Sequence, residues 1–157
     1  PMADNPHIKV VATNRRARHD YHIEDTLEAG LVLTGTEIKS LRAGRASMVD
    51  CYVGVTRGEA FIYNLQISPY EQGNRYNQPE KRPRKLLLHK SEIDWLAGQI
   101  ARKGYTVVGL QLYLKNGKMK LQIGLAKGKK AFDKREDIKA RDTKRELDRT
   151  VKESRRD

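Results

Sequence analysis

The stretch that decides the fold is Tyr105–Gly128, YTVVGLQLYLKNGKMKLQIGLAKG. Asn116-Gly117 separates two runs of alternating apolar and polar residues, and an Asn-Gly pair tolerates the positive φ angles of a tight hairpin turn. The pattern predicts an antiparallel hairpin. The apolar positions expected to share a face are Leu110, Leu112 and Leu114 on the first strand and Met119, Leu121, Ile123 and Leu125 on the second.

Two more stretches have hairpin character. DCYVGVTRGEAFIYNLQI is expected to turn near Arg57-Gly58. DYHIEDTLEAGLVLTG alternates and is expected to turn near Ala29-Gly30, with a short helix over 24–29 as the alternative reading. Short strands joined by close turns are typical of small antiparallel barrels.

Helical patterns are fewer. HKSEIDWLAGQIARKGY predicts an amphipathic helix capped by Ser91 with Asp94, ended by Gly104, with Trp95 covering the edge of the core. GTEIKSLRAG predicts a short helix ended by Gly44. The predicted fold is mainly β, a small closed antiparallel barrel with peripheral helices, and SPYEQGNRYNQPEKRPRK is expected to be a long loop.

The charge points to a polyanionic partner. The 157 residues carry a formal net charge of +12, of which residues 127–157 contribute +5 from 13 Lys/Arg and eight Asp/Glu. Nucleic acid fits better than a membrane surface, because the basic C-terminal segment lacks the apolar face of an interfacial helix and no apolar run is long enough to span a bilayer. We expect no membrane partner and a cytoplasmic, monomeric protein. The one cysteine, Cys51, excludes an intrachain disulfide.

Enzyme motifs are scarce. The sequence has no GxGxxG, and KGKK lacks the spacing of a phosphate-binding loop. His19 and His22 form only an HxxH pair, and in a strand they would point to opposite faces. We expect no catalytic residues, no metal and no cofactor.

The segment ATNRRARHDYHI concentrates groups suited to RNA. Arg binds phosphates bidentately, and His and Tyr stack on unpaired bases. The alternative is an N-terminal strand with a solubilising basic edge. Residues 74–85 add a second basic, Tyr-containing stretch.

Three long segments carry a resemblance: NRRARHDYHIEDTLEAGLVLTGTEIKSLRAGRAS, RPRKLLLHKSEID and KGKKAFDKREDIKARDTKRE. Together they resemble the SsrA-binding protein (small protein B) family, from about Val10 onward. The resemblance implies an oligonucleotide-binding-like barrel that binds the tRNA-like domain of transfer-messenger RNA. It also implies a non-enzymatic role in trans-translation, in which the charged RNA is delivered to stalled ribosomes with the elongation factor that carries tRNAs.

The resemblance also assigns RNA-contacting positions. For Glu28, a base or 2′-OH contact and a salt bridge that supports a turn both stay open; for Leu87, a core position and an apolar platform for a base stay open. The implied RNA-binding residues are Asn14, Arg15, Arg16, Arg18, His19, Tyr21, His22, Glu28, Arg84, Lys85 and Leu87.

Residues 1–126 are expected to form the RNA-binding barrel, and residues 127–157 a basic tail that is disordered when free and helical on the ribosome. The tail has almost no apolar residues to pack, so an RNA-lined channel near the decoding centre of the small subunit is its expected partner. This chain has Phe132 where some relatives have His. A phenylalanine there can still stack on a base, but it lacks the hydrogen bond and the charge of an imidazole. The expected ribosome-contacting residues are Lys127, Gly128, Lys129, Lys130, Phe132, Asp133, Lys134, Arg135, Lys139, Arg141 and Arg145. A general RNA-binding or ribosomal protein and an RNA-processing enzyme are the alternative functions.

Overall fold

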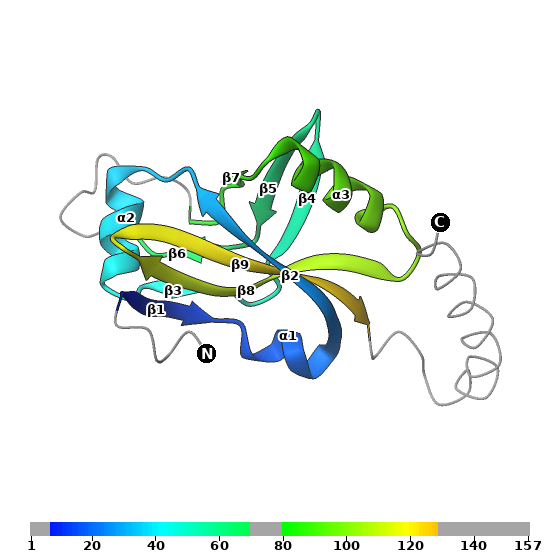
Figure 1. The fold of residues 1–157 in the computed structure, drawn as a ribbon. Coiled ribbons are helices and arrows are strands. Elements are labelled where there is room, and N and C mark those ends of the chain that lie inside the picture. The colour runs from blue at the N-terminus through cyan, green and yellow to red at the C-terminus, as the bar shows by residue number, and fades with distance from the viewer. Residues whose placement is uncertain (1–6, 70–79, 129–157) are drawn as a thin grey trace.

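The computed structural model describes residues 7–69 and 80–128, which form nine strands and three helices (Figure 1). The fold is mainly β, as predicted. The strands are β1 Ile8–Thr13, β2 Tyr21–Leu31, β3 Ala46–Ser47, β4 Tyr52–Thr56, β5 Glu59–Tyr63, β6 Gln66–Ile67, β7 Arg84–Leu87, β8 Tyr105–Lys115 and β9 Lys118–Gly128. The helices are α1 Arg15–Asp20, α2 Gly35–Arg42 and α3 Lys90–Ile100.

The predicted hairpin at Asn116-Gly117 is confirmed. β8 and β9 pair along their whole length, and both turn residues have positive φ, 51° and 78°. A bulge between Gly109 and Gln111 shifts the register, and an inserted residue reverses the alternation of side chains. The prediction that Leu110 and Leu112 share a face is therefore wrong: Leu112 packs in the main core and Leu110 in a separate, smaller cluster.

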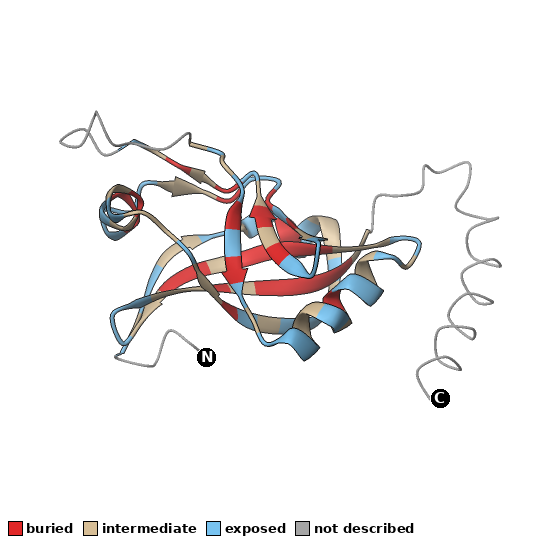
Figure 2. Ribbon diagram, turned by 90° about the horizontal axis from the view of Figure 1, so that it is seen from above, coloured by how far each residue is buried: buried red, intermediate tan, exposed pale blue. Residues whose placement is uncertain are grey.

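All pairings in the large sheet are antiparallel, and followed from strand to strand they return to their start. β8 pairs with β4, β4 with β5, β5 with β7, β7 with β2, β2 with β9, and β9 again with β8. β1 pairs with the second half of β8, and β3 and β6 form a separate two-stranded sheet. The buried positions lie on the strands at the centre of the molecule (Figure 2). The main core includes Leu41, Ile62, Leu65, Leu86, Leu96, Leu112, Leu121 and Ile123.

The second predicted hairpin is confirmed and the third is wrong. β4 and β5 turn at Arg57-Gly58, where both residues have positive φ. β2, in contrast, runs without a turn through Ala29 and Gly30, and no helix forms over 24–29. It pairs with β9 along most of its length and with β7 at its end. Gly30 is placed beneath the Leu87 side chain, where an added Cβ would lie 3.1 Å from the Leu87 Cβ.

The helices cap and cover the strands. α2 begins with a capping box in which Thr34 and Glu37 satisfy each other's backbone N–H groups, and Gly44 follows its end with φ 75°, as predicted. α3 covers β4 and β8, and Trp95 packs against the core as expected. The predicted Ser91 cap is wrong, because α3 begins at Lys90 and its cap lies two residues earlier than predicted.

His89 is the cap residue of α3, and its backbone N–H donates to Glu92 Oε1 at 2.9 Å, which leaves Ser91 inside the first turn. The helix ends at Ile100, so Gly104 (φ 83°) lies in the turn that leads to β8 rather than at the helix end. The loop predicted over 68–85 is also too long, since Arg84 and Lys85 begin β7. Within the described residues, no helix is long and apolar enough to cross a membrane.

Candidate nucleic-acid interface

The α1 helix presents four predicted RNA-binding side chains to solvent. Arg15, Arg16, Arg18 and His19 are exposed, whereas Ala17 is 2% exposed and anchors the helix in the smaller apolar cluster. That cluster also holds Val108, Leu110 and Ala126. The basic segment is therefore a helix and not the N-terminal strand of the alternative reading.

Asn14 fixes this helix to the sheet. Its Oδ1 accepts from Ala17 N at 3.2 Å as the helix cap, and its Nδ2 donates to the Gly109 carbonyl at 2.8 Å. Its backbone N–H donates to the Leu110 carbonyl at 2.8 Å. These contacts use both ends of the amide inside the protein, so Asn14 supports the predicted RNA surface from below.

The next three predicted residues have different surroundings. His19 Nδ1 lies 3.0 Å from Asp20 Oδ1 at the end of α1. Tyr21 is half-buried against the smaller cluster, while His22 is exposed on β2. His19 and His22 thus belong to different elements, and the described part of the chain holds no group of three or more His, Cys, Asp or Glu suited to a metal ion.

A second group of predicted residues lies on the outer face of β2 and β7. Lys85 is exposed and forms a surface ion pair with Glu59 at 3.2 Å. Leu87 is 54% exposed and pairs in register with Gly30. The exposure excludes the core reading of Leu87 and leaves an apolar side chain facing solvent.

Glu28, on the same face, is held in place by its neighbours. Tyr113 Oη donates to Glu28 Oε2 at 2.5 Å, and Lys115 Nζ lies 3.4 Å from the same oxygen. The Tyr113 hydrogen bond lowers the pKa of Glu28, burial opposes it, and Lys115 adds to the lowering. Burial and Glu28 in turn raise the pKa of Tyr113. Glu28 is thus a charged acceptor with a fixed orientation, and its side chain is 38% exposed.

Arg84, which was predicted to bind RNA, lies inside the protein and on neither of these surfaces. Its side chain is completely buried. Arg84 Nε donates to Glu37 Oε2 at 2.7 Å, and its two remaining nitrogens donate to the Leu65 and Glu80 carbonyls. Arg82 binds the other oxygen of Glu37 at 2.5 Å. Each guanidinium nitrogen of Arg84 is bonded inside the protein, so the side chain stabilises the packing of α2 on β7 and is not accessible to a phosphate.

Burial and the Glu37 cluster also act on the pKa values. Burial lowers the pKa of Arg84, and Glu37 opposes that shift. Burial alone would raise the pKa of Glu37, but hydrogen bonds from Arg82, the Thr34 N–H and Arg84 outweigh it, so that pKa lies below 4.5.

Two of the predicted tail residues belong to the sheet. Lys127 and Gly128 are the last residues of β9 and pair with His22 and Tyr21 of β2. Lys127 Nζ also lies 5.7 Å from the centre of the Tyr105 ring. The other predicted tail residues, at positions 129–145, lie outside the described residues.

The sequence did not single out the exposed apolar residues near α1. Val10, Val49 and Tyr52 are 41%, 53% and 43% exposed. One signal was available for Tyr52: Val53 is buried in the alternating strand β4, so its neighbour must point outward. Val49 lies in a stretch without periodicity and carried no such signal.

The profile of a protein family described as "SmpB protein" matches residues 11–153. The chain belongs to this SmpB family. An SsrA-binding protein of Shouchella clausii is 58% identical over 152 residues, covering 97% of each chain. An SsrA-binding protein of Acetivibrio thermocellus is 60% identical over 146 residues, covering 93% of this chain and 95% of the relative.

A solved structure supports the same family. The neighbour, described as "tmRNA-SmpB: a journey to the center of the bacterial ribosome", is 49% identical. The alignment covers 82% of this chain and 92% of the solved chain, with a TM-score of 0.68. The mainly β fold with a few helices that the sequence predicted is therefore shared with this solved structure.

Proposed function

We propose that this SmpB chain binds the tRNA-like domain of transfer-messenger RNA and brings it to stalled ribosomes for trans-translation. The relatives are named for SsrA binding, and the solved neighbour is described with transfer-messenger RNA and the ribosome. The observation that carries the proposal is the α1 surface. Arg15 and Arg16 project from a helix that Asn14 holds on a rigid sheet, and neither forms an ion pair with another described residue.

The α1 surface suits the phosphate backbone. Arginines at a water-facing helix bind phosphate oxygens bidentately at little cost in lost internal pairs, because these two have none to break. Such contacts position a nucleic acid without reading its sequence.

The face with Glu28, Lys85 and Leu87 supplies contacts of another kind. Leu87 offers an apolar platform for a sugar or base, and Glu28 is an acceptor for a 2′-OH or a base amino group. The Glu28 carboxylate, beside Lys115, distinguishes RNA from a plain polyanion, because the RNA also offers hydroxyl and amino donors.

The scaffold under both surfaces is, in this proposal, a closed barrel of the oligonucleotide-binding kind, which the cyclic order of strand pairing supports. The protein acts as a monomer in the cytoplasm, without catalysis, and delivers the RNA together with the elongation factor that carries tRNAs. In this proposal residues 129–157 enter the decoding region and the empty mRNA channel of the ribosome. The segment is disordered in the free protein and becomes helical on the ribosome. The charge of these residues supports this part, with Lys129, Lys130, Lys134 and Arg135 following β9 in the sequence.

Filter binding tests the RNA partner. Transfer-messenger RNA, bulk tRNA and ribosomal RNA fragments are titrated across a salt series, and we expect preference for the first. Arg16→Ala should weaken binding and lower the log–log salt slope by about 0.7–0.9 per lost phosphate contact. Arg57→Ala, at the β4–β5 turn, removes the same charge elsewhere and should change little. Equal affinity for all three RNAs would indicate a general RNA-binding protein instead.

Truncation tests the tail. The chain should be ended after Gly128, because Lys127 and Gly128 pair with β2 and their removal would shorten the sheet. We expect the truncated protein to keep its melting temperature and its affinity for transfer-messenger RNA but to fail in tagging stalled chains. Asp133→Ala/Lys134→Ala/Arg135→Ala should likewise impair tagging without releasing the RNA. Normal tagging by either variant would refute the role of the tail.

A further inference from the structure

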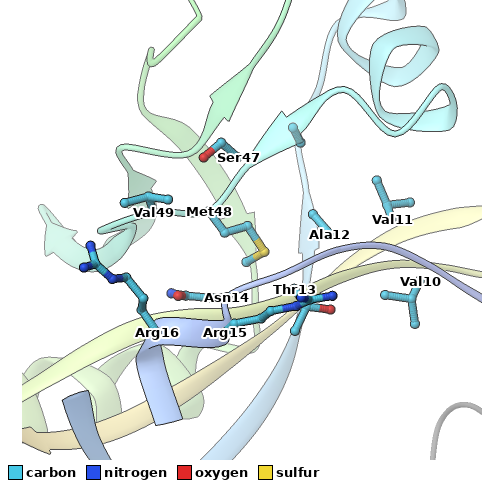
Figure 3. A pocket seen from close by; sticks show the side chains of 11 residues that line it. Val10, Val11, Ala12, Thr13, Asn14, Arg15, Arg16, Ser47, Met48 and Val49 are labelled. Atoms are coloured by element: carbon cyan, nitrogen blue, oxygen red, sulfur yellow. The ribbon is translucent and has the colours of Figure 1, made fainter. Parts of the chain in front are cut away.

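Two hollows lie next to each other between the segments 10–21 and 46–52. The larger, of about 450 Å³, is lined by residues 10–16 and 46–49, and Figure 3 shows Val10 toward one end of it and Arg16 and Val49 toward the other. The smaller, of about 180 Å³, is lined by residues of α1, the start of β2, residues 50–52 and two residues of β8. Asn14 and Arg16 line both, so the hollows form one groove with Arg16 at its middle.

The groove exists because one edge of β8 changes partner. β1 pairs with β8 over Gln111–Lys115, and β4 pairs with it at Val108. Between them, the Leu110 carbonyl accepts from Asn14 N and the Gly109 N–H donates to the Cys51 carbonyl at 3.3 Å. The two segments diverge above this junction, and the hollows lie between them. The walls are thus built on backbone hydrogen bonds.

The walls combine exposed apolar side chains with positive charge. Among the described residues, five large hydrophobic side chains are exposed, and three of them, Val10, Val49 and Tyr52, line this groove. Exposed apolar surface of this kind marks an interaction site. Arg15 and Arg16 also line the larger hollow. The occupant of the groove must therefore carry negative charge together with flat apolar surface.

Unpaired nucleotides have both properties. Base–aromatic and base–apolar contacts tolerate any base, and a basic groove follows the backbone. The smaller hollow lies below the roughly 300–1,000 Å³ typical of sites for drug-sized ligands, which suits a single base.

We propose that this groove binds two successive unpaired nucleotides of the RNA, with the linking phosphate on Arg16 and one base in each hollow. The base in the larger hollow packs against Val49, and the base in the smaller hollow packs against Tyr52. The inference rests on the proposed RNA-binding function and assigns a feature of that RNA, unpaired nucleotides, to a defined place.

The smaller hollow adds a preference. Asp20, Asp50 and Thr106 line it, so its walls are rich in oxygen acceptors. Carboxylates accept hydrogen bonds from base amino groups. The base bound there is therefore one with an exocyclic amino group, and uracil is disfavoured.

The test is fluorescence anisotropy with labelled single-stranded octamers of cytidine and of uridine. We expect the cytidine octamer to bind more tightly than the uridine octamer and than a duplex of the same length. Val49→Glu and Tyr52→Ala should each lower the affinity for the cytidine octamer by roughly 5- to 150-fold, the range that one stacked base contact supplies. Tyr52→Phe retains the ring and Arg57→Ala lies outside the groove, so both should bind as the wild type does.

The outcomes separate the two proposals. Val49 is exposed, so Val49→Glu should keep the wild-type melting temperature. Tyr52 also stacks on Tyr63, with 5.3 Å between the ring centres, so Tyr52→Ala should melt somewhat lower, and its binding is compared at a temperature where both proteins are folded. If both variants bind the cytidine octamer normally, the groove inference is overturned, even where Arg16→Ala still loses the tRNA-like domain. Equal affinity for cytidine and uridine octamers overturns the amino-group preference. A wild-type protein without preference for the tRNA-like domain refutes the proposed function, whatever the octamers show.

Discussion

Replacing Asn14 with alanine should uncouple α1 from the sheet. The substitution removes the Oδ1 cap on Ala17 N and the Nδ2 bond to the Gly109 carbonyl. Loss of a cap costs about 0.5–2 kcal/mol, and loss of a part-buried hydrogen bond costs about 0.5–1.5 kcal/mol. The free energy of unfolding should therefore fall by about 1–3.5 kcal/mol.

The RNA affinity should fall with it, although Asn14 lies under the surface. α1 has only six residues, and a helix of that length is not stable by itself. Once its cap and its bond to β8 are lost, Arg15 and Arg16 no longer occupy fixed positions. The salt slope of RNA binding should then decrease as it would on loss of the arginines themselves.

Urea denaturation gives the stability, and amide hydrogen exchange at Ala17 reports on the cap. Asn14→Ser is the matched control, because a serine hydroxyl caps the helix but is too short to reach the Gly109 carbonyl, so its loss should be about half as large. Wild-type stability and wild-type protection of the Ala17 amide in Asn14→Ala would refute the reasoning. Weaker RNA binding with both unchanged would instead indicate that Asn14 touches the RNA.

Three further predictions concern the core. Glu37→Ala leaves the buried Arg84 without its carboxylate and should cost roughly 3–5 kcal/mol in urea denaturation. Because the folded-state pKa of Glu37 lies below 4.5, its contribution is present above that value and should be lost as the pH falls through the folded pKa, an acid transition that Glu37→Ala lacks. Gly109→Ala places a Cβ 2.7 Å from Cys51 Sγ and should lower stability by about 1–3 kcal/mol, and Cys51→Ala in the same chain should restore part of it; no restoration would contradict the contact. Burial raises the pKa of the Cys51 thiol to about 11, so alkylation at pH 8 should be slow in the native protein and fast in urea, and equal rates would show that the site opens readily.

Local sequence correctly predicted the hairpins whose turn geometry depends only on the residues within the turn. Asn116-Gly117 and Arg57-Gly58 adopt positive φ in the structure, as their hairpins require. Ala29-Gly30 looked like a turn for the same reason, but Gly30 is there because Leu87, 57 positions later, packs over it. A glycine required by a distant side chain cannot be distinguished from a turn glycine by local pattern.

The candidate site shows the same limit. The basic residues of α1 were found, but their helix was not, because a single buried alanine, Ala17, replaces the apolar stripe that would reveal it. Asn14 before this run carried the usable signal, as asparagine is a favoured cap residue. Arg84 and Lys85 look equivalent in sequence, and only Glu37, 47 positions from Arg84, makes one of them internal.

The end of β9 has a consequence for how the two halves of the chain work together. Gly128 pairs with Tyr21, the residue directly after α1. Neighbouring strands lie about 4.8 Å apart, so residue 129 continues from a point one strand spacing away from the basic helix. That point of departure is fixed by the hydrogen bonds of β2. A ligand bound to α1 and a ligand bound to the C-terminal segment would therefore be attached to neighbouring points of the chain. Binding of the first would give binding of the second a high effective concentration.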